Sequence, residues 1–144
     1  MFFPDFPLGT TGDPNYANSL LKREMGEWNY NETLKSYVRP IVYLGWVRAV
    51  MNGQSRLHSR LKIKSPVLVM HGDCSADGVE WTDDYLHCDG VLDVDQIEDW
   101  APYLGEKVTT RTIPNGLHDL YLSRKSVRDN AYHETFSFIE DHIK

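Results

Sequence analysis

The sequence predicts an α/β protein in which parallel strands are flanked by helices. Two observations favour this class: β-favouring runs at Val67–Met70 and Lys107–Ile113, and a helical pattern after each run. Because a strand–helix–strand–helix order forms right-handed crossover units, the two strands are expected to be parallel. A chain of 144 residues with 41% hydrophobic residues is large enough to form a core of its own.

Residues 1–62 are predicted to be helical. Asp13 and Pro14 suit an N-cap and a first helical residue, and Gly26 suits the end of that helix. A second helix is expected from Pro40 to Gly53, and it is apolar on most sides, which is typical of a helix that is buried or covers apolar surface. Its apolar positions are Ile41, Val42, Leu44, Trp46, Val47, Ala49 and Val50.

Residues 63–144 are predicted to alternate strand and helix. The apolar run Val67–Met70 does not alternate with polar residues, which is typical of a strand with both faces covered. The next helix is expected at Asp93–Leu104, with Asp93 as the cap and Gln96 returning the capping bond. After the strand Lys107–Ile113 and a turn, the last helix begins at Ser126. Two strands do not complete a doubly wound sheet, so part of the sheet is expected to be missing.

Charge and composition exclude several classes of partner. A net charge of −6, with acidic residues crowded between the first strand and the next helix, disfavours nucleic acid. No apolar run is long enough to span a membrane, and the apolar start lacks the basic region of a signal peptide. Two cysteines, Cys74 and Cys88, are expected to be free thiols in a reducing, cytoplasmic compartment.

The carboxyl ends of the two predicted strands are the expected place for chemistry. His118 lies in a tight loop after the second strand, where an imidazole can act as a general base near neutral pH. The long connection after the first strand offers several acids. Asp89, just ahead of the next helix, could hold the imidazole of His118 in the correct tautomer, and Asp77 is the alternative acid.

A metal site is a weaker interpretation of the same connection. Cys74, His87 and Cys88 lie there among aspartates, but their spacing matches no common zinc pattern. Adjacent ligands at His87 and Cys88 also make a single tetrahedral site difficult. We therefore expect neither a metal nor a cofactor.

The order of motifs resembles the C-terminal half of serine α/β-hydrolases, of the lysophospholipase and monoacylglycerol-lipase-like branch. Three segments that follow or join the predicted strands carry the resemblance: residues 65–72, 89–94 and 116–123. Three segments of the first part are similar to that branch's helical cap: residues 16–21, 26–31 and 45–49. The resemblance implies a cap at residues 1–62 and the C-terminal half of the catalytic core at residues 63–144.

The resemblance also implies an activity, with one large departure. It makes Asp89 the acid and His118 the base of a Ser-Asp-His triad in an ester hydrolase. The family's Gly-x-Ser-x-Gly elbow is absent, and neither Ser75 nor Ser123 has the required context. The serine is therefore expected on a missing N-terminal half, and the chain alone is expected to be inactive.

Two expectations about partners follow from that interpretation. An ester or lipid-like substrate would place its acyl chain against apolar side chains of the cap, namely Trp28, Trp46 and Val50. The open sheet edge would pair with the missing half or with a second copy of the chain. The alternative interpretation is a non-catalytic or degenerate hydrolase-like module that pairs with another chain.

Overall fold

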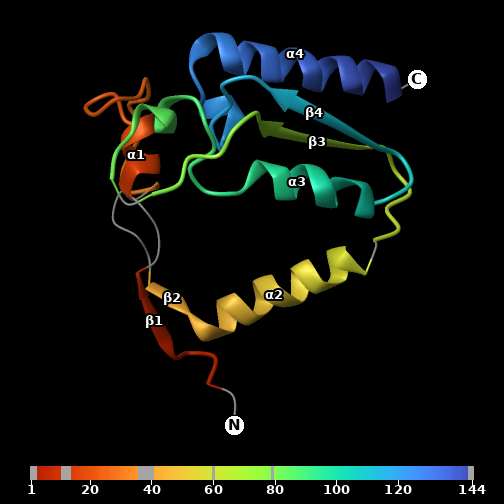
Figure 1. Cartoon of the computed structure of the whole chain (residues 1–144), viewed down its shortest axis with the longest axis horizontal. Helices are drawn as coiled ribbons and strands as arrows, with labels where there is room; N and C mark the ends of the chain where they lie inside the picture. The colour runs from red at the N-terminus through yellow and green to blue at the C-terminus, as the bar shows by residue number, and fades with distance from the viewer. Residues whose placement is uncertain (1–2, 11–13, 36–40, 60, 79, 143–144) are drawn as a thin grey trace.

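The structure of the chain is a computed structural model that describes residues 3–10, 14–35, 41–59, 61–78 and 80–142. At its centre, β3 (Val67–Gly72) and β4 (Val108–Ile113) pair in parallel, with Val67 opposite Val108 and Gly72 opposite Ile113. Both predicted strands and their parallel pairing are confirmed. Figure 1 shows that the two arrows point the same way, so both carboxyl ends lie at one edge of the sheet.

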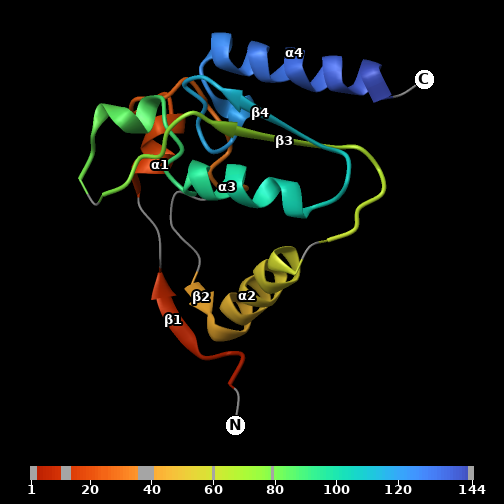
Figure 2. The same cartoon turned by 45° about the vertical axis from the view of Figure 1, so that its right-hand side comes forward.

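Two helices cover the faces of this parallel pair. α3 (Val94–Trp100) contacts β3 on one face, and α4 (Lys125–His142) contacts both strands on the other. Figures 1 and 2 agree on this three-layer arrangement. The core lies between the sheet and α4 and consists of Ile113, Leu120, Val127 and Ala131. The predicted α/β class is thus confirmed, although these elements do not make a complete hydrolase fold.

α3 begins as expected and ends early. The carboxylate of Asp93 accepts a hydrogen bond from the backbone N–H of Asp95, which confirms the predicted cap. Gln96 bonds the Asp93 carboxylate rather than its backbone N–H, at 3.1 Å. The α-helix ends at Trp100 and a short 3-10 helix follows, because Pro102 has no N–H to continue the α-helical ladder.

The N-terminal part contains strands that the sequence did not predict. β1 (Pro7–Thr10) and β2 (Ile41–Tyr43) form a separate antiparallel pair, so the prediction of helices alone is wrong. A β-branched and aromatic triplet fits a strand as well as the first turn of a helix, and pairing with β1 selects the strand. The predicted cap at Asp13 and the predicted start at Pro40 lie outside the described residues.

The two helices of the N-terminal part also differ from prediction. α1 (Pro14–Leu20) ends before Gly26. The chain then turns back, and a Cβ on Gly26 would lie 2.1 Å from the backbone of Leu20. α2 (Leu44–His58) continues through Gly53 and has no buried residue, so of the two expected alternatives, a buried helix or one that covers apolar surface, the first is wrong.

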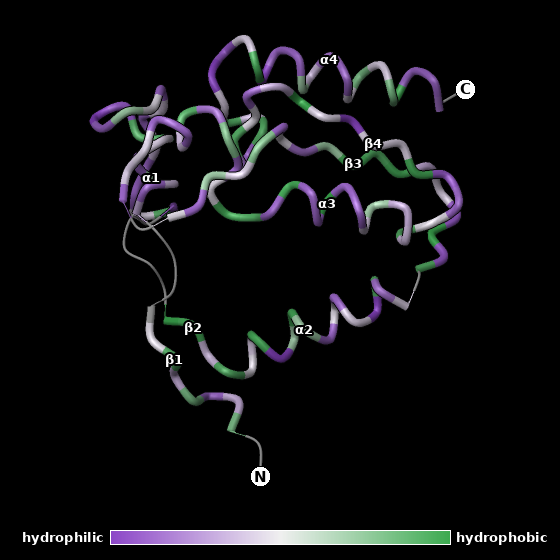
Figure 3. Tube along the Cα trace, in the orientation of Figure 1, coloured by the Kyte–Doolittle hydropathy of each residue, from purple (hydrophilic) through white to green (hydrophobic). Residues whose placement is uncertain are grey.

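Hydropathy along the chain reflects this exposure. Apolar residues colour β3, where Val67–Met70 are half-buried, and they recur along α2, which has no buried residue (Figure 3). In the described part of the chain, no helix has the length and apolar character needed to cross a membrane.

Candidate functional site

The loop that carries His118, residues 114–123 (the histidine loop), is fixed against the end of β3. Gly72 and Gly116 approach so closely that a Cβ on Gly72 would lie 2.4 Å from the carbonyl oxygen of Gly116. Asn115 takes a left-handed backbone with φ of 60°, which asparagine tolerates better than most residues. Its N–H donates to the Asp73 carboxylate at 2.8 Å. These contacts therefore hold the loop against the carboxyl end of β3.

The far end of the same loop is fixed by a buried serine. Ser123 is fully buried, and its Oγ accepts a hydrogen bond from the N–H of Leu117 at 3.0 Å. This bond closes the loop around a short 3-10 helix at Leu120–Leu122. Ser123 thus has a structural partner and is not exposed for attack, as expected from the sequence.

The segment that carries Asp89, residues 88–93 (the acid loop), returns to the chain just beyond β3 through backbone hydrogen bonds. The N–H of Asp89 donates to the carbonyl of Cys74 at 2.8 Å, and the N–H of Ala76 donates to the carbonyl of Asp89 at 2.7 Å. One carboxylate oxygen of Asp89, Oδ1, accepts from the N–H groups of Val91 and Leu92 at 2.8 and 2.9 Å. These bonds orient the carboxylate and leave Oδ2 for another donor.

That donor is the imidazole of His118. Its Nδ1 lies 3.0 Å from Oδ2 of Asp89, and the Asp89 side chain is only 3% exposed. The prediction that these two side chains meet at one rim of the sheet is confirmed. Asp77, the alternative acid, is exposed, and no hydrogen bond joins it to His118 among the described residues. With Nδ1 engaged, the 31%-exposed imidazole keeps Nε2 for a second partner.

The electrostatics of the pair follow from these contacts. The Asp89 hydrogen bond raises the pKa of His118 above its ordinary value, against the opposing effect of partial burial. Burial raises the pKa of Asp89, but the hydrogen bonds from His118, Leu92 and Val91 outweigh burial and lower it. Each partner therefore favours the charged form of the other, which suits a base that becomes an imidazolium during a reaction.

A second carboxylate joins α1 to the histidine loop. Asp119 accepts hydrogen bonds from the Tyr16 hydroxyl and from Lys35 Nζ, the latter at 3.2 Å. The Tyr16 ring lies edge-on to the His118 imidazole, with 5.9 Å between centroids. Burial and the bond to Asp119 both raise the pKa of Tyr16, so its hydroxyl stays a donor. No local pattern in the sequence predicts this network, because Tyr16 and Asp119 are 103 positions apart.

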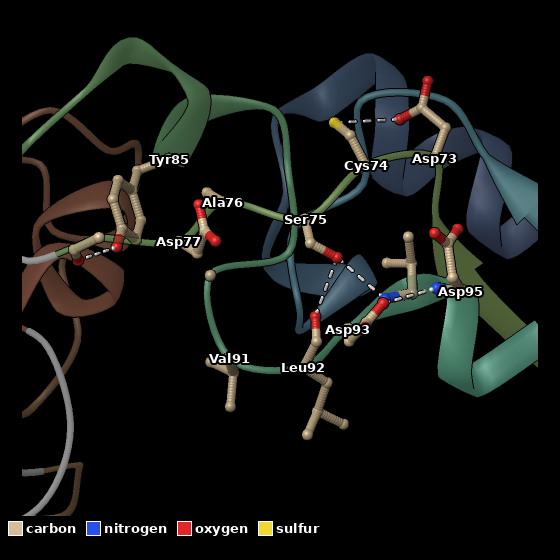
Figure 4. Close-up of a pocket in the computed structure, with 13 residues that line it drawn as sticks. Asp73, Cys74, Ser75, Ala76, Asp77, Tyr85, Val91, Leu92, Asp93 and Asp95 are labelled. Carbon is tan, nitrogen blue, oxygen red and sulfur yellow. Dashed lines mark hydrogen bonds between the residues drawn. The ribbon is translucent and has the colours of Figure 1, made fainter.

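Two pockets lie near the pair. One of about 310 Å³ is lined by Met70 and residues 118–122. Another of about 740 Å³ is lined by residues 73–78, Tyr85 and residues 90–95, and Figure 4 shows its acidic side chains. There Ser75 accepts from the N–H of Val94 at 2.9 Å and donates to the carbonyl of Leu92 at 3.3 Å. Ser75 therefore supports the start of α3 and is not placed as a nucleophile.

The two cysteines form a disulfide, so the expectation of free thiols is wrong. The bond joins Cys74, just beyond β3, to Cys88, which is adjacent to Asp89. The expected cytoplasmic location depended on reduced thiols and loses that support. Asp84, His87 and Cys88 do bring donor atoms within 4.8 Å of one another, but a sulfur bonded to Cys74 cannot serve as a thiolate ligand.

The three residues predicted to line an acyl site do not come together. The Trp28 indole donates to the carbonyl of Leu122 at 2.5 Å and thus lies beside the histidine loop. Trp46 and Val50 lie on α2, where they are 61% and 37% exposed, and neither lines the pocket beside His118. Of the three, only Trp28 is placed near the candidate site.

The chain was compared with family models, with curated proteins and with solved structures, and none of the three comparisons found a match.

Proposed function

We propose that this chain supplies the acid and the base of a carboxylic-ester hydrolase, of the esterase or lysophospholipase type that its motifs resemble. The observation that carries the proposal is the 3.0 Å contact between His118 Nδ1 and the buried carboxylate of Asp89. A buried carboxylate that orients one imidazole nitrogen, at the carboxyl edge of a parallel sheet, is the arrangement that the acid and base of a nucleophilic triad require.

The roles of the two residues follow from their geometry. His118 Nε2 removes the proton from a serine hydroxyl as that oxygen attacks the ester carbonyl. Asp89 holds the Nδ1–H tautomer and offsets the charge of the imidazolium that forms. The imidazolium then protonates the leaving alcohol, and an acyl-serine remains. The same imidazole next activates water, which releases the carboxylic acid and restores the serine.

The serine in this scheme comes from a polypeptide outside residues 1–144, because the chain has no Gly-x-Ser-x-Gly motif. The structure offers places where such a polypeptide could pair. β3 and β4 are each paired on one side only within the described residues. The exposed apolar side chains of β2 and α2, among them Ile41, Trp46 and Met51, also have no cover in the described chain.

The substrate class is proposed from the same resemblance. A lipid-like ester would place its acyl chain against apolar cap residues, with Trp28 beside the histidine loop and with Trp46 and Val50 brought nearer by the partner polypeptide. A preference for short polar esters in the assembled enzyme would contradict this part of the proposal.

The exposed apolar surface favours a second candidate, a non-catalytic module that pairs with another chain. In that case the open strand edge and α2 form the interface, and the Asp89–His118 contact only stabilises the loop. The two candidates differ in one respect: only the hydrolase needs an imidazole at position 118.

A fluorophosphonate probe separates the two candidates. Tagged wild-type chain and the variant His118→Ala are purified from cells that express the chain naturally, and serine labelling is read on every co-purifying polypeptide. We expect the wild type to carry a labelled partner, and the variant to retain that partner without label. A partner that stays unlabelled with both chains, or that is labelled with both, contradicts the hydrolase, as does a wild-type chain with no labelled partner.

A further inference from the structure

The Cys74–Cys88 disulfide lies directly behind the acid of the site. Cys74 comes two residues after the end of β3, and Cys88 is the residue before Asp89. Between them, the described residues 75–78 and 80–87, called the excursion below, leave the sheet and return. The disulfide therefore closes this excursion at the point where the chain must place the Asp89 carboxylate.

Besides the disulfide, two backbone hydrogen bonds join Asp89 to the chain just beyond β3. The N–H of Asp89 bonds the carbonyl of Cys74, and the carbonyl of Asp89 accepts from Ala76. The bonds from Val91 and Leu92 to the carboxylate act within the acid loop, so they orient the side chain without attaching the loop to β3. Apart from the disulfide, these two backbone bonds and the Ser75 hydroxyl, which bonds Leu92 and Val94, hold the end of the excursion near β3 against loop-closure entropy.

The excursion itself has further contacts that do not involve the strand. Tyr85 is buried, and its hydroxyl donates to the carbonyl of Gly78 within the same excursion. The Cα of Gly90 sits against the Tyr85 ring, where an added Cβ would lie 2.8 Å from ring carbons. The first of these contacts lies within the excursion, and the second joins it to the residue after Asp89, while the 3-10 turn Asp83–Leu86 contacts α1. None of them joins the excursion to the end of β3, and the disulfide does so covalently, through Cys74.

We propose that the Cys74–Cys88 disulfide positions Asp89 for its hydrogen bond to His118, so that reduction of the disulfide uncouples the acid from the base. This inference rests on the proposed function, because it concerns the same pair of residues. Cys74 and Cys88 are positioning residues: they touch neither the imidazole nor a substrate.

The reduction step needs a dithiol and nothing else. A thiolate of the dithiol attacks one sulfur of the disulfide, the other sulfur leaves as a thiolate and is protonated, and a mixed disulfide forms. The second thiol of the reagent then displaces the protein sulfur. The reagent ends as a cyclic disulfide, the protein holds two thiols, and the S–S bond no longer closes the excursion. Because the chain has only two cysteines, no other disulfide competes.

The test measures the pKa of His118 by NMR on the full chain, with the resonance assigned through His118→Ala among the six histidines. Four groups act on this imidazole: Asp89 from the acid loop, Asp119 from its own loop, and Lys35 and Tyr16 from the N-terminal part. Only the first is attached through the disulfide. Asp89→Asn therefore gives the value for an imidazole that has lost its acid.

We expect the oxidised chain to titrate above the Asp89→Asn variant, and the dithiol-reduced chain to titrate close to that variant. A double variant, Cys74→Ser with Cys88→Ser, should match the reduced chain and should not respond to the dithiol. If oxidised and reduced chains titrate alike, above the Asp89→Asn variant, the positioning role is wrong and the pair stands. If the oxidised chain already titrates like Asp89→Asn, the pair and the proposed function fail.

Amide hydrogen exchange separates positioning from general stability. We expect reduction to increase exchange at the amides of Asp89 and Ala76, whose bonds attach the acid loop, while the amides of β4 keep their protection. Loss of protection throughout β4 would show that the disulfide holds the whole fold, and the specific role proposed for it would be rejected.

Discussion

The two parts of the chain differ in how far they bury their apolar side chains. From Tyr85 onward, the protein buries a set of residues from strands, loops and helices; these are Tyr85, Cys88, Val94, Ala101, Ile113, Leu117, Leu120, Val127 and Ala131. In the N-terminal part, the buried apolar residues are Leu20 and Leu21, at the end of α1, while β2 and α2 bury none within the described residues. One part has a core of its own, and the other contributes a helix to it.

This difference indicates which part of the chain holds the candidate site in place. The Asp89–His118 pair sits on the part that has a core, at a rim fixed by Gly72, Gly116 and Ser123. α1 reaches the same rim through Tyr16 and Asp119. The arm formed by β1, β2 and α2 lies away from the rim in both Figure 1 and Figure 2. A change in one part can therefore be compared with a matched change in the other.

The largest expected effect is a cavity in the C-terminal core. Ile113→Ala removes a fully buried side chain that packs with Leu120, Val127 and Ala131, and should lower the free energy of unfolding by about 2–5 kcal/mol. Met51→Ala on α2 removes a side chain that is 62% exposed, and should change it by less than about 0.5 kcal/mol. Urea denaturation measures both. A comparable loss for Met51→Ala would mean that α2 packs on a core after all.

The same contrast can be drawn with glycine. In Gly116→Ala the new Cβ would lie 2.5 Å from the Leu120 side chain and 2.9 Å from the carbonyl of Ile113, and should cost about 1–3 kcal/mol. In Gly53→Ala the Cβ meets nothing within 4 Å in the middle of α2, and should favour the helix by about 0.5–1 kcal/mol. Thermal denaturation reports the first, and far-UV circular dichroism the second. Equal tolerance at both positions would contradict the close approach of Gly72 and Gly116.

In the part that has the core, the sequence alone predicts the order and type of the main elements. The positions of β3, β4, α3 and α4 follow from apolar periodicity and from local signals such as the Asp93 cap, so they were predicted closely. The meeting of Asp89 and His118 follows in turn from parallel strands, since both loops leave the same edge. Local pattern and tertiary packing agree in this part of the chain.

Elsewhere the structure depends on contacts that a local pattern does not encode. The triplet Ile41–Tyr43 is compatible with a strand or a helix, and only its pairing with β1 decides. The bond from Tyr16 to Asp119 joins residues that are 103 positions apart. The disulfide had one usable signal, which was that Cys74 and Cys88 flank an excursion that returns to the same strand end. A reducing compartment would have favoured free thiols instead, and that expectation is wrong.

The pH dependence of stability tests the pair itself. Because the pKa of Asp89 is lowered from 3.8 and that of His118 is raised from 6.5, the pair stabilises the fold fully between these two ordinary values. Its contribution is lost as the pH falls through the folded pKa of Asp89, or rises through the folded pKa of His118. The stability difference between wild type and Asp89→Asn should therefore be larger at about pH 5 than at about pH 9. Asp77→Asn, as the control, should show no such trend.

The smallest expected effect concerns the contact between α1 and the rim. Tyr16→Phe removes the hydroxyl that donates to Asp119, and should cost about 1 kcal/mol in the free energy of unfolding. The pKa of Asp119 should rise, since the Tyr16 and Lys35 hydrogen bonds lower it against the effect of burial. Tyr43→Phe, on an exposed strand of the arm, is the matched control and should change neither quantity. Urea denaturation and carboxyl NMR titration measure the two effects. If both variants behaved alike, Tyr16 would not join α1 to the histidine loop, and α1 would belong with the arm.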